Sequence, residues 1–118
     1  MKIYTNILKE NWVVDNVIKE WNEYQQDIVT LKIRDADIIW IIAPWTWRKL
    51  PKLILKNKKV VCTIHHIDFD KFNDKEKKEF YRRDKYVDYY HTVSAKSREQ
   101  IQTLTDKKIF QIPFWINQ

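Results

Sequence analysis

Short apolar runs alternate with amphipathic segments along the chain. Runs rich in β-branched and aromatic residues predict strands at 3–8, 38–43, 59–64, 89–93 and 108–112. The run at 38–43 is continuous in apolar character and ends at Pro44, which is typical of a strand covered on both faces in a parallel sheet. Residues 28–33 alternate in polarity, which predicts a further, edge-like strand.

Helical patterns separate these runs. Asn11 is expected to cap a first helix, in which Val14, Val17, Ile18 and Trp21 have the spacing of one buried stripe. Further helices are predicted at 50–56, 73–83 and 95–105.

The predicted helix starts carry capping residues. Asn73 with Glu76 three residues later matches a capping box, and Ser94 stands at an N-cap position. Strands that alternate with helices of this length predict βαβ crossovers. We therefore expect one α/β domain, a Rossmann-like parallel sheet with helices on both faces.

The composition limits the classes of protein to which this chain can belong. The 118 residues suffice for one domain, and glycine is absent, which excludes the Gly-rich phosphate loops of kinases, GTPases and ordinary dehydrogenases. The only cysteine is Cys62, which is expected to be buried and inert. The chain has no apolar run long enough to span a membrane, and its first residues do not resemble a signal peptide. A cytoplasmic location is therefore expected.

The formal net charge of +6 leaves three interpretations open. These are an ordinary lysine-rich surface, an anionic membrane surface and nucleic acid. A membrane contact would use Arg48, Lys49, Lys52 and Lys56, which lie beside tryptophans with no acidic residue between Arg48 and Lys59. Nucleic acid is not expected, because no known binding motif is present.

Ligands of open parallel sheets bind beyond the carboxyl ends of the strands. The loops there nominate these residues for a ligand crevice: Asn11, Trp45, Thr46, Trp47, Asp68, Ser94 and Lys96. The tryptophans are interpreted either as a platform for a sugar or base, or as packing against the core or a further domain.

His65 and His66 are the sharpest polar feature, because they follow a buried strand directly. A histidine there can orient or deprotonate a hydroxyl group, since its pKa lies near neutrality. The other interpretation is a ring fixed by a backbone carbonyl. A metal site is not expected, because adjacent histidines point apart and no spaced ligand motif accompanies them.

Residues 59–117 resemble the second part of the N-terminal domain of a GT-B glycosyltransferase of the retaining, group 1-like type. Three segments carry the resemblance: the strand 60–65 that ends in histidine, the segment 86–94 with aspartate, short strand and Val-Ser, and the segment 107–117 with Lys-Ile-x-x-Ile-Pro-x-x-Ile-Asn. Trp115 stands where the family usually has glycine, and residues 8–12 lack the family's Gly-rich loop.

The resemblance implies that residues 1–118 form the acceptor-side domain of an enzyme that uses a nucleotide-sugar donor. His65 or His66 would lie near the reacting sugar, and Phe114, Trp115 and Asn117 would adjoin a C-terminal donor-binding domain that this chain lacks. The chain would bind no cofactor itself and would not transfer sugar alone; it would need the missing domain or a partner subunit. The alternative is a non-catalytic α/β module that docks to an anionic membrane or a protein.

Overall fold

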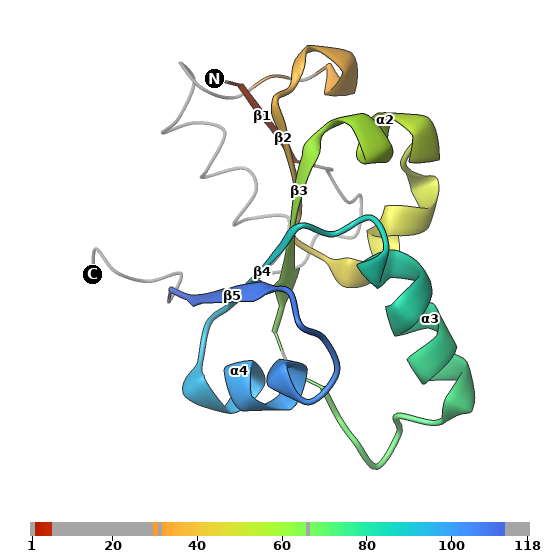
Figure 1. The fold of residues 1–118 in the computed structure, drawn as a ribbon, viewed down its shortest axis with the longest axis vertical. Helices are drawn as coiled ribbons and strands as arrows, with labels where there is room; N and C mark the ends of the chain where they lie inside the picture. Colours follow the sequence, from red (N-terminus) through yellow and green to blue (C-terminus); the bar gives the residue numbers. More distant parts are fainter. Residues whose placement is uncertain (1, 6–29, 31, 66, 113–118) are drawn as a thin grey trace, which may run out of the picture.

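In a computed structural model, which describes residues 2–5, 30, 32–65 and 67–112, the strands form one parallel sheet. The strands are β1 (Ile3–Thr5), β2 (Ile38–Ile41), β3 (Lys59–Ile64), β4 (Tyr89–Thr92) and β5 (Lys108–Gln111). Each strand pairs in parallel with the next one in the sequence, in the order β1-β2-β3-β4-β5 (Figure 1). The predicted Rossmann-like α/β class is thereby confirmed.

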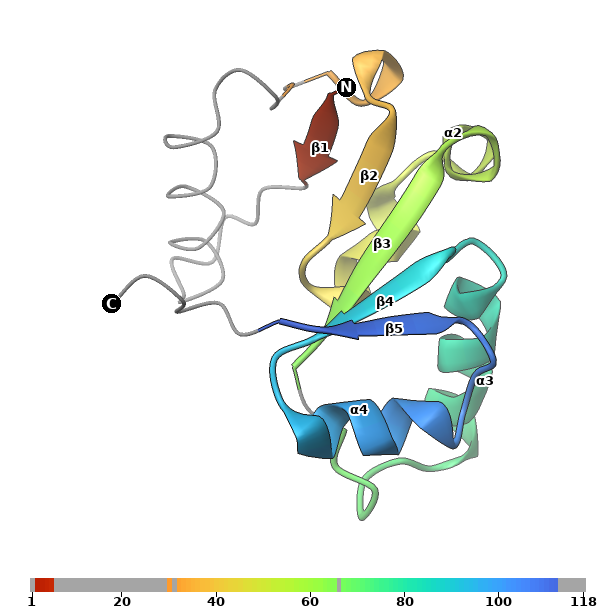
Figure 2. The ribbon, with the colours of Figure 1, turned by 60° about the vertical axis from the view of Figure 1, so that its left-hand side comes forward.

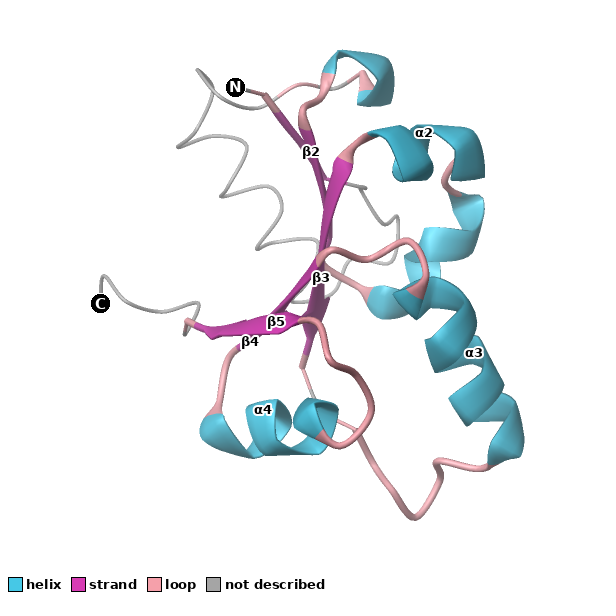
Figure 3. Ribbon diagram, viewed as in Figure 1, coloured by secondary structure: helices cyan, strands magenta, loops and turns pink. Residues whose placement is uncertain are grey.

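Helical segments connect the strands. They are η1 (Ile33–Asp35), η2 (Pro44–Lys49), α2 (Lys52–Asn57), α3 (Asp74–Asp84) and α4 (Ala95–Gln102). Helices α2 and α3 lie on one side of the sheet, and α4 lies beneath β4 and β5 (Figures 1 and 3). The sheet twists strongly, so that β5 runs at a large angle to β2 (Figure 2).

The capping residues act where the sequence predicts them. The Asn73 side chain accepts a hydrogen bond from the backbone N–H of Glu76 at 3.1 Å. The Ser94 hydroxyl accepts one from the N–H of Ser97 at 3.2 Å. Each cap satisfies a donor that the first turn of a helix leaves without an intrahelical partner, which explains why α3 and α4 begin where they do.

The core lies between the sheet and these helices. Alternate residues of the central strands, such as Ile39 and Val60, are fully buried on this face. The ring of Phe80 from α3 stacks on Tyr90 from β4, with centroids 5.8 Å apart and planes inclined by 10°. The Tyr90 hydroxyl donates to Asp84 Oδ1 at 2.5 Å, so this buried polar tip has a partner.

The predicted strand at 28–33 is not observed at its described residues, which are 30, 32 and 33. The N–H of Thr30 donates to the carbonyl of Ile3 at 3.0 Å, but no strand forms there. Residues 33–35 form the η1 turn, in which the N–H of Ala36 donates to the Ile33 carbonyl, so the end of the predicted strand is a turn. Residues 28, 29 and 31 and the predicted first helix lie outside the described residues.

Candidate functional site

A cleft of about 640 Å³ opens at the carboxyl ends of β2 and β3, between η2 and α3. Its lining comprises Pro44, Trp45, Arg48, Ile64, His65, Ile67, Asp68, Lys71, Phe72, Lys75, Glu76, Glu79, Phe80 and Arg83. The cleft thus occupies the edge at which open parallel sheets bind ligands, and its volume is that of a small-molecule site.

His65 follows the last residue of β3, and its ring is held by the backbone just after the neighbouring strand β2. Its Nε2 lies 3.1 Å from the carbonyl oxygen of Ile42. A carbonyl only accepts, so Nε2 carries the proton, and a neutral ring then presents its lone pair at Nδ1. Burial lowers the pKa of His65 below its ordinary value, against the smaller opposing effect of this hydrogen bond. The imidazole is therefore neutral near pH 7.

Trp45 is the exposed aromatic side chain of the cleft. It is 53% exposed, whereas Trp47, two residues on, is 5% exposed. The Thr46 hydroxyl donates to the Ala43 carbonyl at 2.7 Å and holds the turn that separates the two indoles. Of these three candidates for the crevice, only Trp45 contributes to the lining, while Thr46 and Trp47 are buried parts of the scaffold.

Glu79 of α3 joins the two sides of the cleft. Its Oε1 accepts from Trp47 Nε1 at 2.8 Å and from Arg48 Nε at 2.7 Å, and Arg48 also forms an ion pair with Oε2. The hydrogen bond from Arg48 holds the pKa of Glu79 below its ordinary value, and the bond from Trp47 acts in the same direction. This carboxylate therefore fixes η2 against α3 as a charged acceptor.

The loop after β3 forms one wall of the cleft. Asp68 lines the cleft, and its Oδ1 accepts from the N–H of Asp70 at 3.1 Å. The Gln100 side chain bonds both backbone groups of Ile67, accepting from the N–H at 3.2 Å and donating to the carbonyl at 2.8 Å. Helix α4 thereby fixes the start of this loop.

Ser94 and Lys96 stand apart from the cleft lining. Ser94 is occupied with capping α4, and Lys96 is exposed. Helix α4 nevertheless supports the site, because the hydroxyl of Ser97 donates to the His65 carbonyl at 2.7 Å. The remaining predicted site residues lie outside the described part of the chain: Asn11, His66, Phe114, Trp115 and Asn117.

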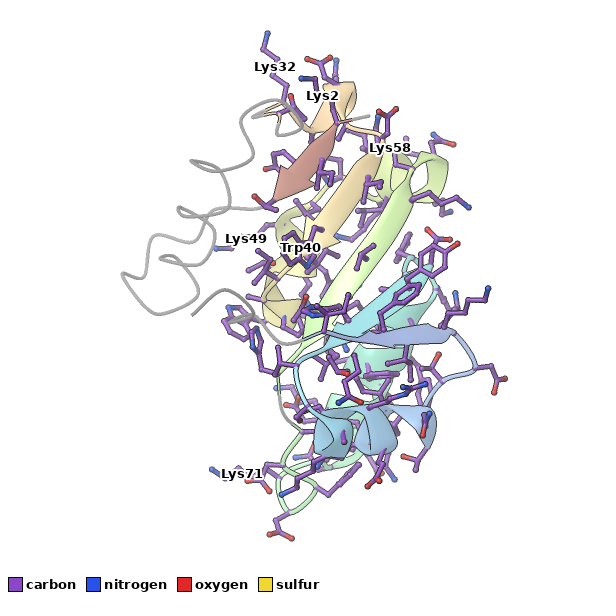
Figure 4. The ribbon with its side chains drawn as sticks, turned by 90° about the vertical axis from the view of Figure 1, so that its left-hand side faces the viewer. Lys2, Lys32, Trp40, Lys49, Lys58 and Lys71 are labelled. Atoms are coloured by element: carbon purple, nitrogen blue, oxygen red, sulfur yellow. The ribbon has the colours of Figure 1, made fainter. Side chains whose placement is uncertain are left out.

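A second polar cluster includes Trp40, which lies on the sheet face that Figure 4 presents. Trp40 Nε1 donates to Thr63 Oγ1 at 2.8 Å, and His91 Nε2 lies 2.6 Å from the Ile112 carbonyl. Burial lowers the pKa of His91, so this ring too is neutral near pH 7. His91 was expected to lie in a strand, with no functional role; a histidine within a predicted buried strand was the signal available in the sequence.

Two of the four basic residues nominated for a membrane contact have partners within the fold. Arg48 pairs with Glu79, although no acid is near it in the sequence. Lys52 Nζ donates to the carbonyls of Trp47, Arg48 and Leu50, each at 2.9 Å. Lys49 and Lys56 are exposed. In the fold, therefore, α3 supplies a carboxylate to Arg48, and carbonyls at the end of η2 bind the ammonium group of Lys52.

In residues 2–5, 30, 32–65 and 67–112, no group of three or more histidine, cysteine or acidic side chains is placed to hold a metal ion. No helix within these same ranges is both long enough and apolar enough to cross a bilayer.

The chain finds no match among protein-family models, curated proteins or solved structures.

Proposed function

We propose that this chain is the acceptor-binding half of a glycosyltransferase that uses a nucleotide-sugar donor. The observation that carries the proposal is the position of His65, at the carboxyl end of the buried strand β3 and in the lining of the cleft. The sequence resemblance to GT-B N-terminal domains supports the same assignment, since it rests on the strand that ends in this histidine.

The chemistry of the cleft suits a polyhydroxylated ligand. The half-exposed indole of Trp45 offers an aromatic face for a sugar ring. The Asp68 and Glu76 side chains, both exposed in the lining, supply acceptors for hydroxyl groups. Apolar side chains from Ile64, Ile67 and Phe72 line the same cleft beside these polar groups.

His65 is proposed to orient the acceptor hydroxyl. Because its Nε2–H is committed to the Ile42 carbonyl, the basic atom of the neutral ring is Nδ1. The lowered pKa keeps the ring neutral near pH 7, so that Nδ1 can accept a hydrogen bond from the acceptor hydroxyl. The donor would be held by a second domain or a partner subunit, and the chain alone is expected to bind acceptor without transferring sugar.

Binding of saccharides to the isolated chain tests this function. Two-dimensional ¹H–¹⁵N NMR spectra would be recorded during titration with neutral mono- and oligosaccharides. Saturable shifts are expected at the indole N–H of Trp45 and the amides of His65 and Asp68. Trp45→Ala should abolish these shifts, whereas Tyr81→Ala, which removes an aromatic side chain of similar exposure outside the lining, should leave them unchanged. Equal shifts in both variants, or none in the wild type, would contradict the proposal.

The docking alternative has less support. Of the four residues nominated for an anionic membrane, Arg48 and Lys52 are engaged with Glu79 and with backbone carbonyls. Cosedimentation with vesicles that contain phosphatidylserine would restore this alternative if Lys49→Gln and Lys56→Gln together abolished binding.

A further inference from the structure

Arg83 lies on the inner side of α3 and lines the cleft. It is only 7% exposed, although its neighbour Arg82 is exposed. Its guanidinium carbon lies 4.9 Å from the centre of the Phe80 ring, so the cation packs on an aromatic face. Arginine is almost never this deeply buried unless it is paired.

The described residues give Arg83 no anionic partner. Its Nε is buried and has no hydrogen-bond partner in the structure. The single ion pair within 4.0 Å among the described side chains joins Arg48 to Glu79 and leaves Arg83 out. A desolvated guanidinium without an acceptor opposes folding, because a buried charge needs a partner to replace its hydration.

The other charges of the cleft do not cancel this one. Lys71 and Lys75 add two cations to the lining, and Asp68 and Glu76 add two carboxylates. The third carboxylate, Glu79, is taken by Arg48. Arg83 is therefore the uncompensated charge of the cleft, and its guanidinium packs on the apolar ring of Phe80.

We propose that this cleft binds a small molecule that carries a phosphate or carboxylate group, with Arg83 as the partner of the anion. A guanidinium presents a planar fork of donors that matches either group, and such charge-assisted hydrogen bonds are among the strongest in proteins. If the proposed function holds, this small molecule is the acceptor, a sugar derivative that carries the anionic group; this part of the inference rests on the proposed function. The binding of the anion by Arg83 does not depend on it.

The test observes Arg83 directly. The ¹⁵N-labelled chain would be titrated with inorganic phosphate, glucose 6-phosphate, glucuronate and glucose, at an ionic strength kept constant with sodium chloride. The Nε–H signal of Arg83 should shift saturably with the anions and not with glucose alone. A stronger response to glucose 6-phosphate or to glucuronate identifies the preferred group. No shift with any anion, or the same shift with sodium chloride, would overturn the proposal.

Variants on the same helix provide the matched controls. Arg83→Met retains the length of the side chain without its charge and should weaken anion binding at least about tenfold, the equivalent of one charge-assisted hydrogen bond. Arg82→Met removes an exposed charge one residue away and should leave the affinity unchanged. If Arg83→Met does not fold, Lys75→Gln should still weaken binding a few-fold, and the wild-type Nε–H titration decides the outcome.

Failure of this inference is distinguishable from failure of the proposed function. Saccharides that bind at Trp45 without any preference for an anionic group would overturn the anion site and leave acceptor binding intact. If phosphate shifts the Arg83 signal and no saccharide shifts the Trp45 signal, the anion site is supported and the proposed binding of a sugar acceptor is overturned.

Discussion

Nδ1 of His91 lies 2.9 Å from the hydroxyl oxygen of Thr63, on the neighbouring strand. His91 Nε2 must donate to the Ile112 carbonyl, so in the neutral ring Nδ1 accepts and the Thr63 hydroxyl donates to it. The same hydroxyl accepts from the indole of Trp40. One side chain from β3 therefore satisfies polar groups on both adjacent strands, and each hydrogen bond has a fixed direction.

Replacing this hydroxyl should be costly. Thr63→Val keeps the shape of a fully buried side chain but removes the acceptor of Trp40 and the donor to His91. We expect a loss of about 1–3 kcal/mol in the free energy of unfolding, because the buried His91 ring and the partly buried Trp40 indole each lose this one hydrogen bond. Urea denaturation followed by tryptophan fluorescence measures it. Thr63→Ser, which retains the hydroxyl, should keep the hydrogen bonds, and a larger loss in Ser than in Val would contradict this account.

Stability should fall on mild acidification. Burial lowers the pKa of His65 and of His91, whereas histidine in the unfolded chain titrates near about pH 6.5. The unfolded state therefore binds more protons below that pH, and the free energy of unfolding decreases as the pH falls from about 6.5 toward the folded pKa values. Each histidine contributes a slope of at most about 1.4 kcal/mol per pH unit.

Urea unfolding at several values between about pH 7.5 and about pH 5.5 checks this dependence. Glu79, whose pKa is lowered, loses its contribution only at more acidic pH and does not interfere in this window. His91→Gln should show a shallower pH slope than the wild type. A wild-type stability that rises on acidification would refute the assignment of both rings as neutral.

Removing Glu79 should reduce the stability of the fold more than removing Arg48, its partner in the ion pair. Glu79→Ala leaves the indole N–H of the buried Trp47 without its acceptor, which should cost about 1 kcal/mol or more. Arg48→Ala removes an exposed side chain while Glu79 keeps its bond to Trp47, so its effect should be smaller. Thermal unfolding of both variants gives the order, and the reverse order would show that the ion pair dominates.

Arg83→Met should stabilise the chain in the absence of anions. An unpaired buried guanidinium opposes folding, and an apolar side chain of similar length removes that penalty. Denaturation in a buffer free of phosphate and carboxylate should therefore show an equal or higher free energy of unfolding for the variant. Added phosphate should stabilise only the wild type. A large loss of stability without anions would instead indicate that Arg83 acts as a structural residue.

Cys62 should resist modification in the folded chain. It is fully buried in β3, and burial raises the pKa of its thiol to about 11. The thiolate is the reactive form, so a thiol reagent at neutral pH should react at a rate set by unfolding. Rapid stoichiometric labelling without denaturant would contradict the burial of this side chain.

Local patterns in the sequence determined much of the fold. The apolar runs predicted each described strand to within a few residues, and the inner strands β2 and β3 leave none of their apolar side chains exposed. Asn73 and Ser94 marked the starts of α3 and α4, since capping depends on a residue and the backbone two or three positions later. The order of these elements then indicated a parallel sheet, and with it the position of His65 at the ligand-binding edge.

The tertiary structure alone decided which side chains meet in the cleft. Trp45 and Trp47 are the same residue type two positions apart in the sequence. The η2 turn exposes the first and buries the second, which bonds to Glu79 of α3. Arg48 and Glu79 are 31 residues apart in the sequence and form an ion pair in the fold. Arg83 is indistinguishable from Arg82 in the sequence, yet the rotation of α3 buries one and exposes the other. Such contacts depend on how two elements pack, and the spacing of residues along the chain does not specify that packing.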